Sequence, residues 1–167
     1  MHDKLTQSDI DKMQEEIDYR KLVVRKEAIE AVKEARAQGD LSENFEYYAA
    51  KREKNINESR IRYLEAMIKT AILVDGKSEE DEVGLNKKVT VLVEDEEETE
   101  VYKIVTSVRG NSLEGRITAE SPLGKALMGH KVGDVVYVKV NDSFGYNVEI
   151  KAIENTGEEE TDTLRKF

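Results

Sequence analysis

Hydrophobic residues in the first half of the chain follow the spacing of two long amphipathic helices. They recur at intervals of three, four and seven in two narrow stripes flanked by charged residues. The first stripe comprises Ile10, Met13, Ile17, Val24, Ala28, Ala31 and Ala35, and the second comprises Tyr47, Ala50, Ile61, Leu64, Ile68 and Ala71. Gly39 separates them. Narrow stripes are typical of helices that pack against each other, so residues 1–74 are predicted to form an antiparallel coiled-coil hairpin.

The second half of the chain has the two-residue period of strands. "KVTVLVE" and "TEVYKIV" flank the acidic turn "DEEE", and "VVYVKV" and "YNVEIKAI" flank "NDSFG". Between these pairs, "SPLGKALMG" has a Ser for the N-cap, a Pro in the first turn and a Gly at the end, as in a short helix. Residues 88–154 are therefore predicted to form a small α+β domain, with Leu127, Val132, Val135 and Val136 in its core.

Two polar segments flank this domain. Residues 75–87 contain Gly76 and Gly84 and are predicted to be a linker. Residues 155–167 are acidic and poor in apolar side chains, which is typical of a disordered tail. The fold class expected for the whole chain is thus α+β in two domains.

Composition and charge restrict the classes of function. The chain has no Cys, which excludes disulfides and thiolate metal sites. No apolar run approaches the length of a membrane span, so a soluble, cytoplasmic protein is expected. The net charge is −10, of which residues 1–74 carry −1 and the remainder carries −9. An acidic protein is a poor general binder of nucleic acid, so any such contact needs a local basic patch or a partner protein.

The loop between the two helices concentrates carboxylates: Asp40, Glu43 and Glu46 lie within seven residues. One interpretation is local, because acids are favoured in turns and at the first turn of a helix. The other is metal binding. Mg²⁺ requires six oxygen ligands and takes one or two carboxylates from a protein, so two acids at the end of a long arm could complete a site on another molecule.

Two segments resemble a known family. "GDLSENFEYYAAK" is similar to the acidic-tip signature of the bacterial Gre transcript-cleavage factors, and "ESPLGKALMGHKVGD" is similar to their C-terminal motif. The resemblance extends from about residue 5 to residue 153. It implies a coiled-coil hairpin followed by an FKBP-like antiparallel sheet domain with one short helix. It also implies that the globular domain docks at the secondary channel of RNA polymerase while the hairpin enters it.

The resemblance also implies site residues. Asp40 and Glu43 would help to bind the second catalytic Mg²⁺ of the polymerase, with Ser42 beside them, so that the polymerase cleaves backtracked nascent RNA. The protein would have no nuclease activity by itself and would be a monomer when free. The basic residues behind the tip would contact the 3′ segment of the RNA, namely Arg36, Lys51, Arg52 and Lys54. Ser121, Pro122 and Leu123 are candidates for docking to the polymerase.

Two residues depart from the family pattern. Phe45 and Tyr48 are bulky where small or polar residues are expected, and we interpret both rings as packing across the end of the hairpin, with stacking on an RNA base as the alternative. Two other functions are also compatible with the sequence. The chain could be a paralogue that occupies the same channel without assisting cleavage, or an unrelated coiled-coil adaptor or chaperone.

Overall fold

The computed structural model describes residues 2–39 and 44–166, and the chain divides into two compact units. The first unit is built from Ser8–Ile72 and the second from Lys4–Gln7 together with Leu73–Lys166. None of the helices in the described part of the chain has the length and apolar character needed to cross a bilayer.

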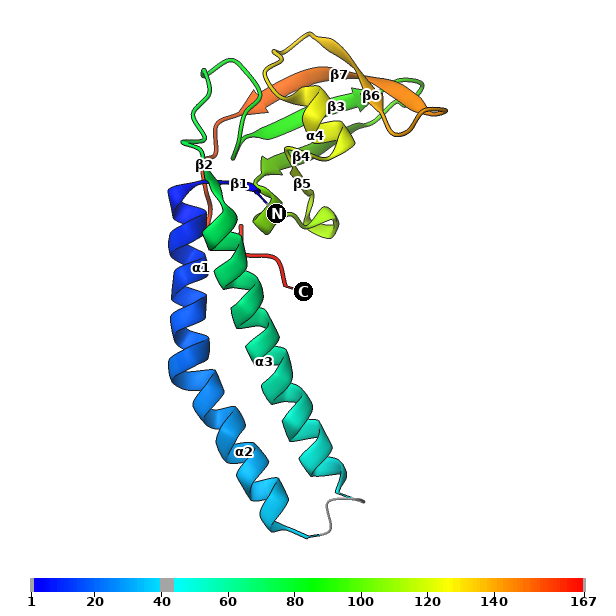
Figure 1. The fold of residues 1–167 in the computed structure, drawn as a ribbon. Helices are drawn as coiled ribbons and strands as arrows, with labels where there is room; N and C mark the ends of the chain where they lie inside the picture. The colour runs from blue at the N-terminus through cyan, green and yellow to red at the C-terminus, as the bar shows by residue number, and fades with distance from the viewer. Residues whose placement is uncertain (1, 40–43, 167) are drawn as a thin grey trace. The chain divides into compact units, whose positions relative to one another are not determined.

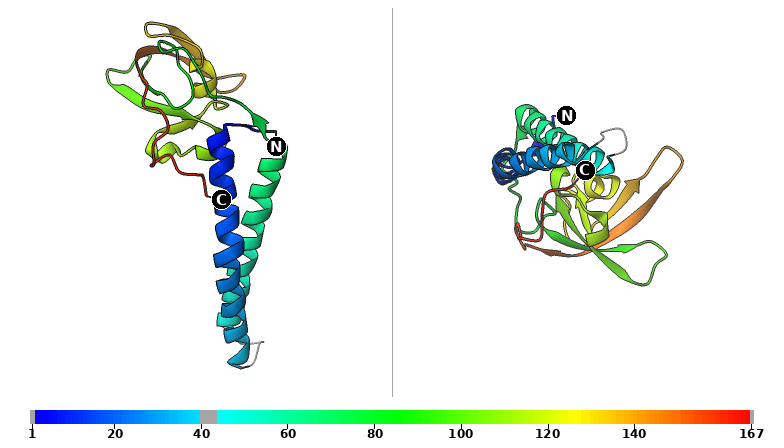
Figure 2. Two further views of the ribbon diagram at one scale, coloured as in Figure 1. Left: turned by 90° about the vertical axis from the view of Figure 1, so that its left-hand side faces the viewer. Right: turned by 90° about the horizontal axis from the view of Figure 1, so that it is seen from below.

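The first unit is the expected helical hairpin (Figure 1). One arm runs through α1 (Gln7–Tyr19), a π-helical turn η1 (Arg20–Val24) and α2 (Arg25–Ala37), and the other arm is α3 (Phe45–Thr70). The two arms lie side by side in both side views of the ribbon (Figures 1 and 2). At 1.5 Å per residue, the 26 residues of α3 span about 39 Å.

The hairpin seam is apolar in the half farther from the loop, where four of the five buried residues belong to the predicted stripes and the fifth, Met67, is buried beside the predicted Ile68. Met13 and Ile17 of α1 are buried, as are Ile61, Leu64 and Met67 of α3. The predicted stripe is wrong at Ala31, which is exposed while its neighbour Val32 is half-buried. The predicted residues on either side of Ala31 keep their places, since Ala28 is half-buried and Ala35 is buried.

The middle of the seam is polar, which the apolar spacing did not indicate. Glu16 accepts hydrogen bonds from Nε of Arg20 and Nε of Arg60, at 2.7 and 2.8 Å. Arg20 also donates to Oδ1 of Asn57 at 3.0 Å. Burial alone raises the pKa of Glu16, but the hydrogen bonds from Arg60 and Arg20 outweigh it and hold this pKa below its ordinary value. The two arms are therefore joined by a partly buried charge network as well as by apolar contacts.

The second unit contains a five-stranded sheet, β5-β4-β3-β7-β6, and the short helix α4 (Pro122–Leu127). The strands are β3 (Lys88–Val93), β4 (Thr99–Val105), β5 (Arg116–Thr118), β6 (Val135–Lys139) and β7 (Gly145–Glu154). Two short strands, β1 (Lys4–Leu5) and β2 (Ile72–Leu73), pair separately. Both predicted strand pairs and the helix are confirmed, and Ser121 caps α4 by accepting from the Gly124 amide at 3.1 Å.

The sheet is mixed, whereas an antiparallel sheet was expected. Strand β5 pairs in parallel with β4, and two 3-10 helices, η2 (Ser107–Arg109) and η3 (Ser112–Glu114), lie between them in the chain. The reversal within this connection lets β5 run in the same direction as β4. A strand of three residues is too short to show an alternating pattern in the sequence.

The core of the second unit lies on one face of the sheet, beneath α4. It contains nine buried apolar residues: Val83, Val89, Val91, Ile104, Leu127, Val136, Val138, Val148 and Ile150. Two residues expected in this core are exposed instead, because β6 is an edge strand of alternating burial. Val135 points to the outer face and is 65% exposed, and Val132 precedes the strand and is 56% exposed.

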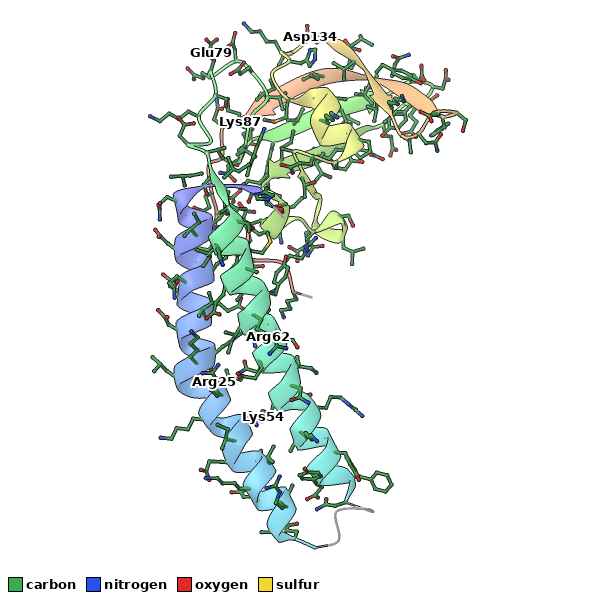
Figure 3. The ribbon with its side chains drawn as sticks, in the orientation of Figure 1. Arg25, Lys54, Arg62, Glu79, Lys87 and Asp134 are labelled. Carbon is green, nitrogen blue, oxygen red and sulfur yellow. The ribbon has the colours of Figure 1, made fainter. Side chains whose placement is uncertain are left out.

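The segment 75–87 was expected to be a linker, but its C-terminal part belongs to the folded second unit. Val83 is in the core, and its amide donates to the carbonyl of His130 at 2.8 Å. The ammonium group of Lys87 donates to the carbonyl oxygens of Glu79 and Glu82. These bonds tie residues 79–82 to the end of the segment, just before β3 (Figure 3). Two apolar residues among polar neighbours, Val83 and Leu85, are too few to give a periodic signal for this arrangement.

The C-terminal segment is also packed, whereas a disordered tail was expected. After β7 the chain turns back within the second unit (Figure 2). Asp162 in this segment is only 3% exposed. Thr156 donates through its hydroxyl to the carbonyl of Asn86, and the Arg165 amide donates to the carbonyl of Val108. The segment has few apolar side chains to hold it, and an ion pair between Asp162 and the buried Lys103 anchors it instead.

Candidate functional site

The loop of the hairpin is held at its base by Asn44. Its Oδ1 accepts from the amide of Tyr47 at 3.0 Å, which caps the N-terminus of α3. Its Nδ2 donates to the carbonyl of Ala35 at 2.5 Å, near the end of α2. The side chain of Asn44 therefore caps α3 and also links it to α2. Asn44 is not among the predicted site residues, although an Asn directly before a helix is a recognised capping signal.

On the other side of the loop, α2 ends at Ala37 and Gly39 has a φ of 137°. A residue with a Cβ is strained at that φ, so this exit from α2 favours glycine. The residues predicted at the tip, Asp40, Ser42 and Glu43, lie outside the described residues. Within residues 2–39 and 44–166, no group of three or more His, Asp or Glu side chains is placed to hold a metal ion.

The four predicted RNA-contacting residues lie near the tip, but they do not form a single patch. Lys51 and Arg52 line an open groove of about 580 Å³ on α3, together with Tyr48 and Ile56. Arg36 of α2 instead faces Tyr47, with its guanidinium 5.5 Å from the ring centroid and Nη2 donating to the hydroxyl at 3.4 Å. The groove thus combines two cations with an aromatic ring and an aliphatic side chain.

Lys54 is half-buried on α3 and takes part in a different group of charges (Figure 3). Glu58 of α3 accepts two hydrogen bonds from Arg25 of α2, at 2.8 and 3.0 Å. The pKa of Glu58 is lowered by the hydrogen bonds from Arg25 and further by the charges of Arg25, Lys54 and Arg62. Lys54 therefore contributes to an interhelical charge cluster farther from the loop.

Three of the predicted cations act on the phenol of Tyr47. The pKa of Tyr47 is lowered chiefly by its hydrogen bond from Arg36 and also by the charges of Lys51, Arg36 and Lys54, although burial opposes the shift. The charges of three of the four predicted cations therefore contribute to the lowered pKa of Tyr47. A region of this kind attracts phosphate groups even though the whole protein is acidic.

The two bulky residues at the start of α3 differ in their surroundings. Phe45 is 85% exposed, so the interpretation that its ring packs across the end of the hairpin is wrong. Tyr48 is 47% exposed and meets Tyr47 edge-on, with their ring centroids 5.5 Å apart. Phe45 is the first residue of α3, where its side chain extends beyond the packed seam.

The predicted docking residues lie at the start of α4. Ser121 is used locally, since its hydroxyl donates to the carbonyl of Thr118 at 2.7 Å and accepts from the Gly124 amide. Leu123 is half-buried against the core, and Pro122 is exposed at the first position of the helix. Of the three, Pro122 has the side chain most accessible to another molecule.

Comparison with known proteins identifies the class. Residues 4–72 match the family model for the N-terminal region of transcription elongation factors, and residues 77–155 match the model described as "Transcription elongation factor, GreA/GreB, C-term". These ranges include the hairpin and the five-stranded sheet, the two parts that define a two-domain elongation factor. The chain belongs to the GreA/GreB family of transcription elongation factors.

Two relatives named GreA agree with this assignment. The chain is 44% identical over 136 residues to the transcription elongation factor GreA of Geobacillus kaustophilus. The aligned part covers 81% of this chain and 86% of that protein. It is 42% identical over 153 residues to GreA of Streptococcus gordonii, covering 91% and 95% of the two chains. Among solved structures, GreA factor homolog 1 (Gfh1) of Thermus thermophilus is 27% identical, with a TM-score of 0.42 and coverage of 92% and 99%.

Proposed function

We propose that this protein stimulates RNA polymerase to cleave backtracked nascent RNA and so restores arrested elongation complexes. The observation that carries the proposal is the base of the hairpin loop, where Asn44 ties the start of α3 to the end of α2. This tie joins the two helices directly beside the segment 40–43, whose sequence contains two carboxylates. Membership of the GreA/GreB family supports the same function.

The chemistry of the tip suits a shared metal ion. Asp40 and Glu43 supply carboxylate oxygens, which are the donors that Mg²⁺ prefers, but two carboxylates are fewer than the six ligands it requires. We therefore assign them as partial ligands of a Mg²⁺ ion whose other ligands belong to the polymerase. When bound, such an ion activates water and stabilises charge on the oxygens of a cleaved phosphodiester. Ser42 would support this site as a neighbouring hydrogen-bonding group.

The groove on α3 suits the RNA that emerges from the polymerase active site. Lys51 and Arg52 can neutralise phosphates, while Tyr48 offers a face on which a base can stack. Phe45, which is largely exposed, offers a second ring nearer the tip. Arg36 and Lys54 would act indirectly, through the positive potential that they create around Tyr47.

The test is an assay on stalled elongation complexes made with purified polymerase and 5′-labelled RNA that has backtracked by a known length. Adding the protein with Mg²⁺ should shorten the RNA and allow the complex to resume synthesis. The protein with the same RNA and Mg²⁺ but without polymerase should leave the RNA intact. If the protein inhibits elongation without shortening the RNA, it is a channel-occupying inhibitor. If it cuts naked RNA, the donated-ligand mechanism is wrong.

A further inference from the structure

Three cationic side chains of the second unit are almost completely buried beneath the C-terminal segment. They are Lys103 on β4, Arg109 in η2 and Arg116 on β5, with side chains only 5, 5 and 7% exposed. Burying a cation is costly unless anionic or hydrogen-bonding partners compensate for the lost water. Here the partners come largely from residues 157–162, which follow the last strand of the sheet.

Lys103 makes the most contacts with this segment. Its ammonium group donates to Oδ2 of Asp162 at 2.5 Å, to the carbonyl of Gly157 at 2.7 Å and to Oε1 of Glu159 at 2.9 Å. These bonds use all three of its N–H donors. Burial alone raises the pKa of Asp162, but the hydrogen bonds from Lys103 and from the Glu159 amide outweigh it and lower that pKa. Asp162 is therefore held as a carboxylate.

Both arginines bind the main chain of the segment, but only Arg109 also pairs with one of its side chains, whereas Arg116 pairs with Glu114 outside it. Arg109 donates to the carbonyl of Asp162 at 2.6 Å and forms an ion pair with Glu158. Arg116 donates to the carbonyl of Thr161 at 3.1 Å, and its Nε is fixed by the carbonyl of Arg109 at 3.0 Å. Contacts to both carbonyl and carboxylate oxygens are typical of recognition of a peptide.

The bound segment has a defined conformation. The Glu159 amide donates to Oδ2 of Asp162, and the Asp162 amide donates to the carbonyl of Glu159, both at 3.0 Å. This turn brings the carboxylates of Glu159 and Asp162 together on the ammonium group of Lys103. The recognised pattern is therefore an acidic turn, Glu-x-x-Asp, preceded by a further acid at Glu158.

We infer that Lys103, Arg109 and Arg116 form a binding cleft for an acidic peptide turn, and that the chain's own residues 157–162 occupy this cleft as an intramolecular ligand. The five-stranded sheet is complete at Glu154, and the family model ends at residue 155, so the segment follows the complete sheet and lies outside the part that defines the family. Its contacts with the three cations are polar and charged. The ligand that fits the cleft in place of this segment is an acidic turn of the same pattern on another protein.

The connection to β7 gives the chain's own segment a high effective concentration, so an external peptide competes poorly with it. The test therefore weakens the internal ligand in the full-length chain through the double substitution Glu159→Gln/Asp162→Asn. The probe is a fluorescent synthetic peptide of residues 155–166, and binding is followed by anisotropy. The matched control is Glu160→Gln, which neutralises an exposed carboxylate of the same segment.

The double variant should bind the peptide at least about tenfold more tightly than the wild type or the Glu160→Gln variant. Adding Lys103→Met to the double variant should abolish the gain, and so should replacing Glu and Asp of the peptide by Gln and Asn. Binding should weaken as salt is raised, since the contacts are ionic. No gain in peptide binding would overturn the inference. Tighter binding of a single-stranded oligonucleotide than of the peptide would also overturn it, because the cleft would then recognise phosphates.

A measurement on the wild type covers the case in which the double variant fails to fold. Hydrogen exchange should show the amides of Glu159, Asp162 and Arg165 opening while the paired amides of β3 and β7 stay protected, as expected for a ligand that can leave. If these amides exchange only when the whole unit unfolds, the segment is an integral part of the fold and the inference is wrong.

Discussion

The side chain of Asn44 donates a hydrogen bond to the main-chain carbonyl of Ala35, nine residues earlier and on the opposite helix. Together with the cap that Asn44 provides to Tyr47, this bond fixes both ends of the loop that carries the tip carboxylates. The proposed function depends on this loop reaching a metal site, so the Asn44 contacts give the first test.

Asn44→Ala removes both contacts, whereas Asn44→Asp keeps an acceptor for the Tyr47 amide and loses the donor to Ala35. Loss of an N-cap costs about 1 kcal/mol, so the Tyr47 amide should exchange about fivefold faster in the Ala variant. The Asp variant should keep slow exchange at Tyr47 but should stimulate cleavage less than the wild type. Equal exchange in all three proteins would show that Asn44 is not the cap.

Asp40→Asn and Glu43→Gln preserve side-chain size but remove the negative charge that a Mg²⁺ ligand requires. Each variant should bind polymerase and compete with the wild type, yet cleavage stimulation should fall by about tenfold or more, since each carboxylate supplies a charged ligand. Glu46→Gln, an exposed residue in the first turn of α3, is the matched control and should retain activity. Full activity of both tip variants would mean that the acids serve only the turn and the helix start.

Lys51→Ala/Arg52→Ala tests the groove on α3. RNA crosslinking to the hairpin should weaken, and cleavage of long backtracked segments should fall by about fivefold while the shortest segments are largely unaffected, because only long segments offer phosphates to the groove. The advantage of the wild type should shrink as salt rises. Lys26→Ala/Lys33→Ala removes the same charge from exposed positions of α2 and should change neither measurement. An equal loss at all lengths would indicate damage to the hairpin.

The Glu16 network makes hairpin stability depend on pH. In the folded state the pKa of Glu16 is below its ordinary value of 4.5. Ionisation of Glu16 therefore stabilises the folded state relative to the unfolded state. Its contribution is complete above about pH 4.5 and is lost as pH falls through the lowered folded-state pKa. Glu16→Gln should reduce the free energy of unfolding by about 2 kcal/mol at pH 7, and this difference should narrow in acid.

Urea unfolding of the wild type and the Glu16→Gln variant between pH 3 and 7 measures this difference. Glu15→Gln is the control, since Glu15 is exposed and pairs with Lys12 at 3.6 Å, an interaction worth little in water. A constant difference between wild type and Glu16→Gln at all pH values would show that the titration of Glu16 does not contribute.

The sequence predicted the parts of this molecule that depend on periodic spacing or local signals. Two apolar stripes predicted the hairpin, alternating residues predicted both strand pairs, and Ser121 predicted the start of α4. The role of the tip acids stays a prediction from their motif and their charge, since Asp40 and Glu43 lie outside the described residues. Asn44 could also have been recognised, because its capping role is local.

The remaining features depend on contacts between residues far apart in the chain. Asn57 and Arg60 are buried in a seam that looked apolar, because Arg20 and Glu16 of the other arm, respectively, form hydrogen bonds with them. The packing of the C-terminal segment follows from Lys103, which precedes Asp162 by 59 residues. Neither arrangement has a periodic or local signal, since a charged residue has the same appearance in a sequence whether it pairs in the interior or lies in water.

The π-helical turn at Arg20–Val24 has a consequence for the evolution of hairpin length. A π turn holds about one residue more than an α turn, so deleting a single residue there could restore a regular α-helix. The segments on either side would keep their own buried faces, and the tip would stay at nearly the same distance from the open end of the hairpin. This turn is therefore the place on the first arm where a one-residue gap between related chains could be absorbed without moving the tip carboxylates.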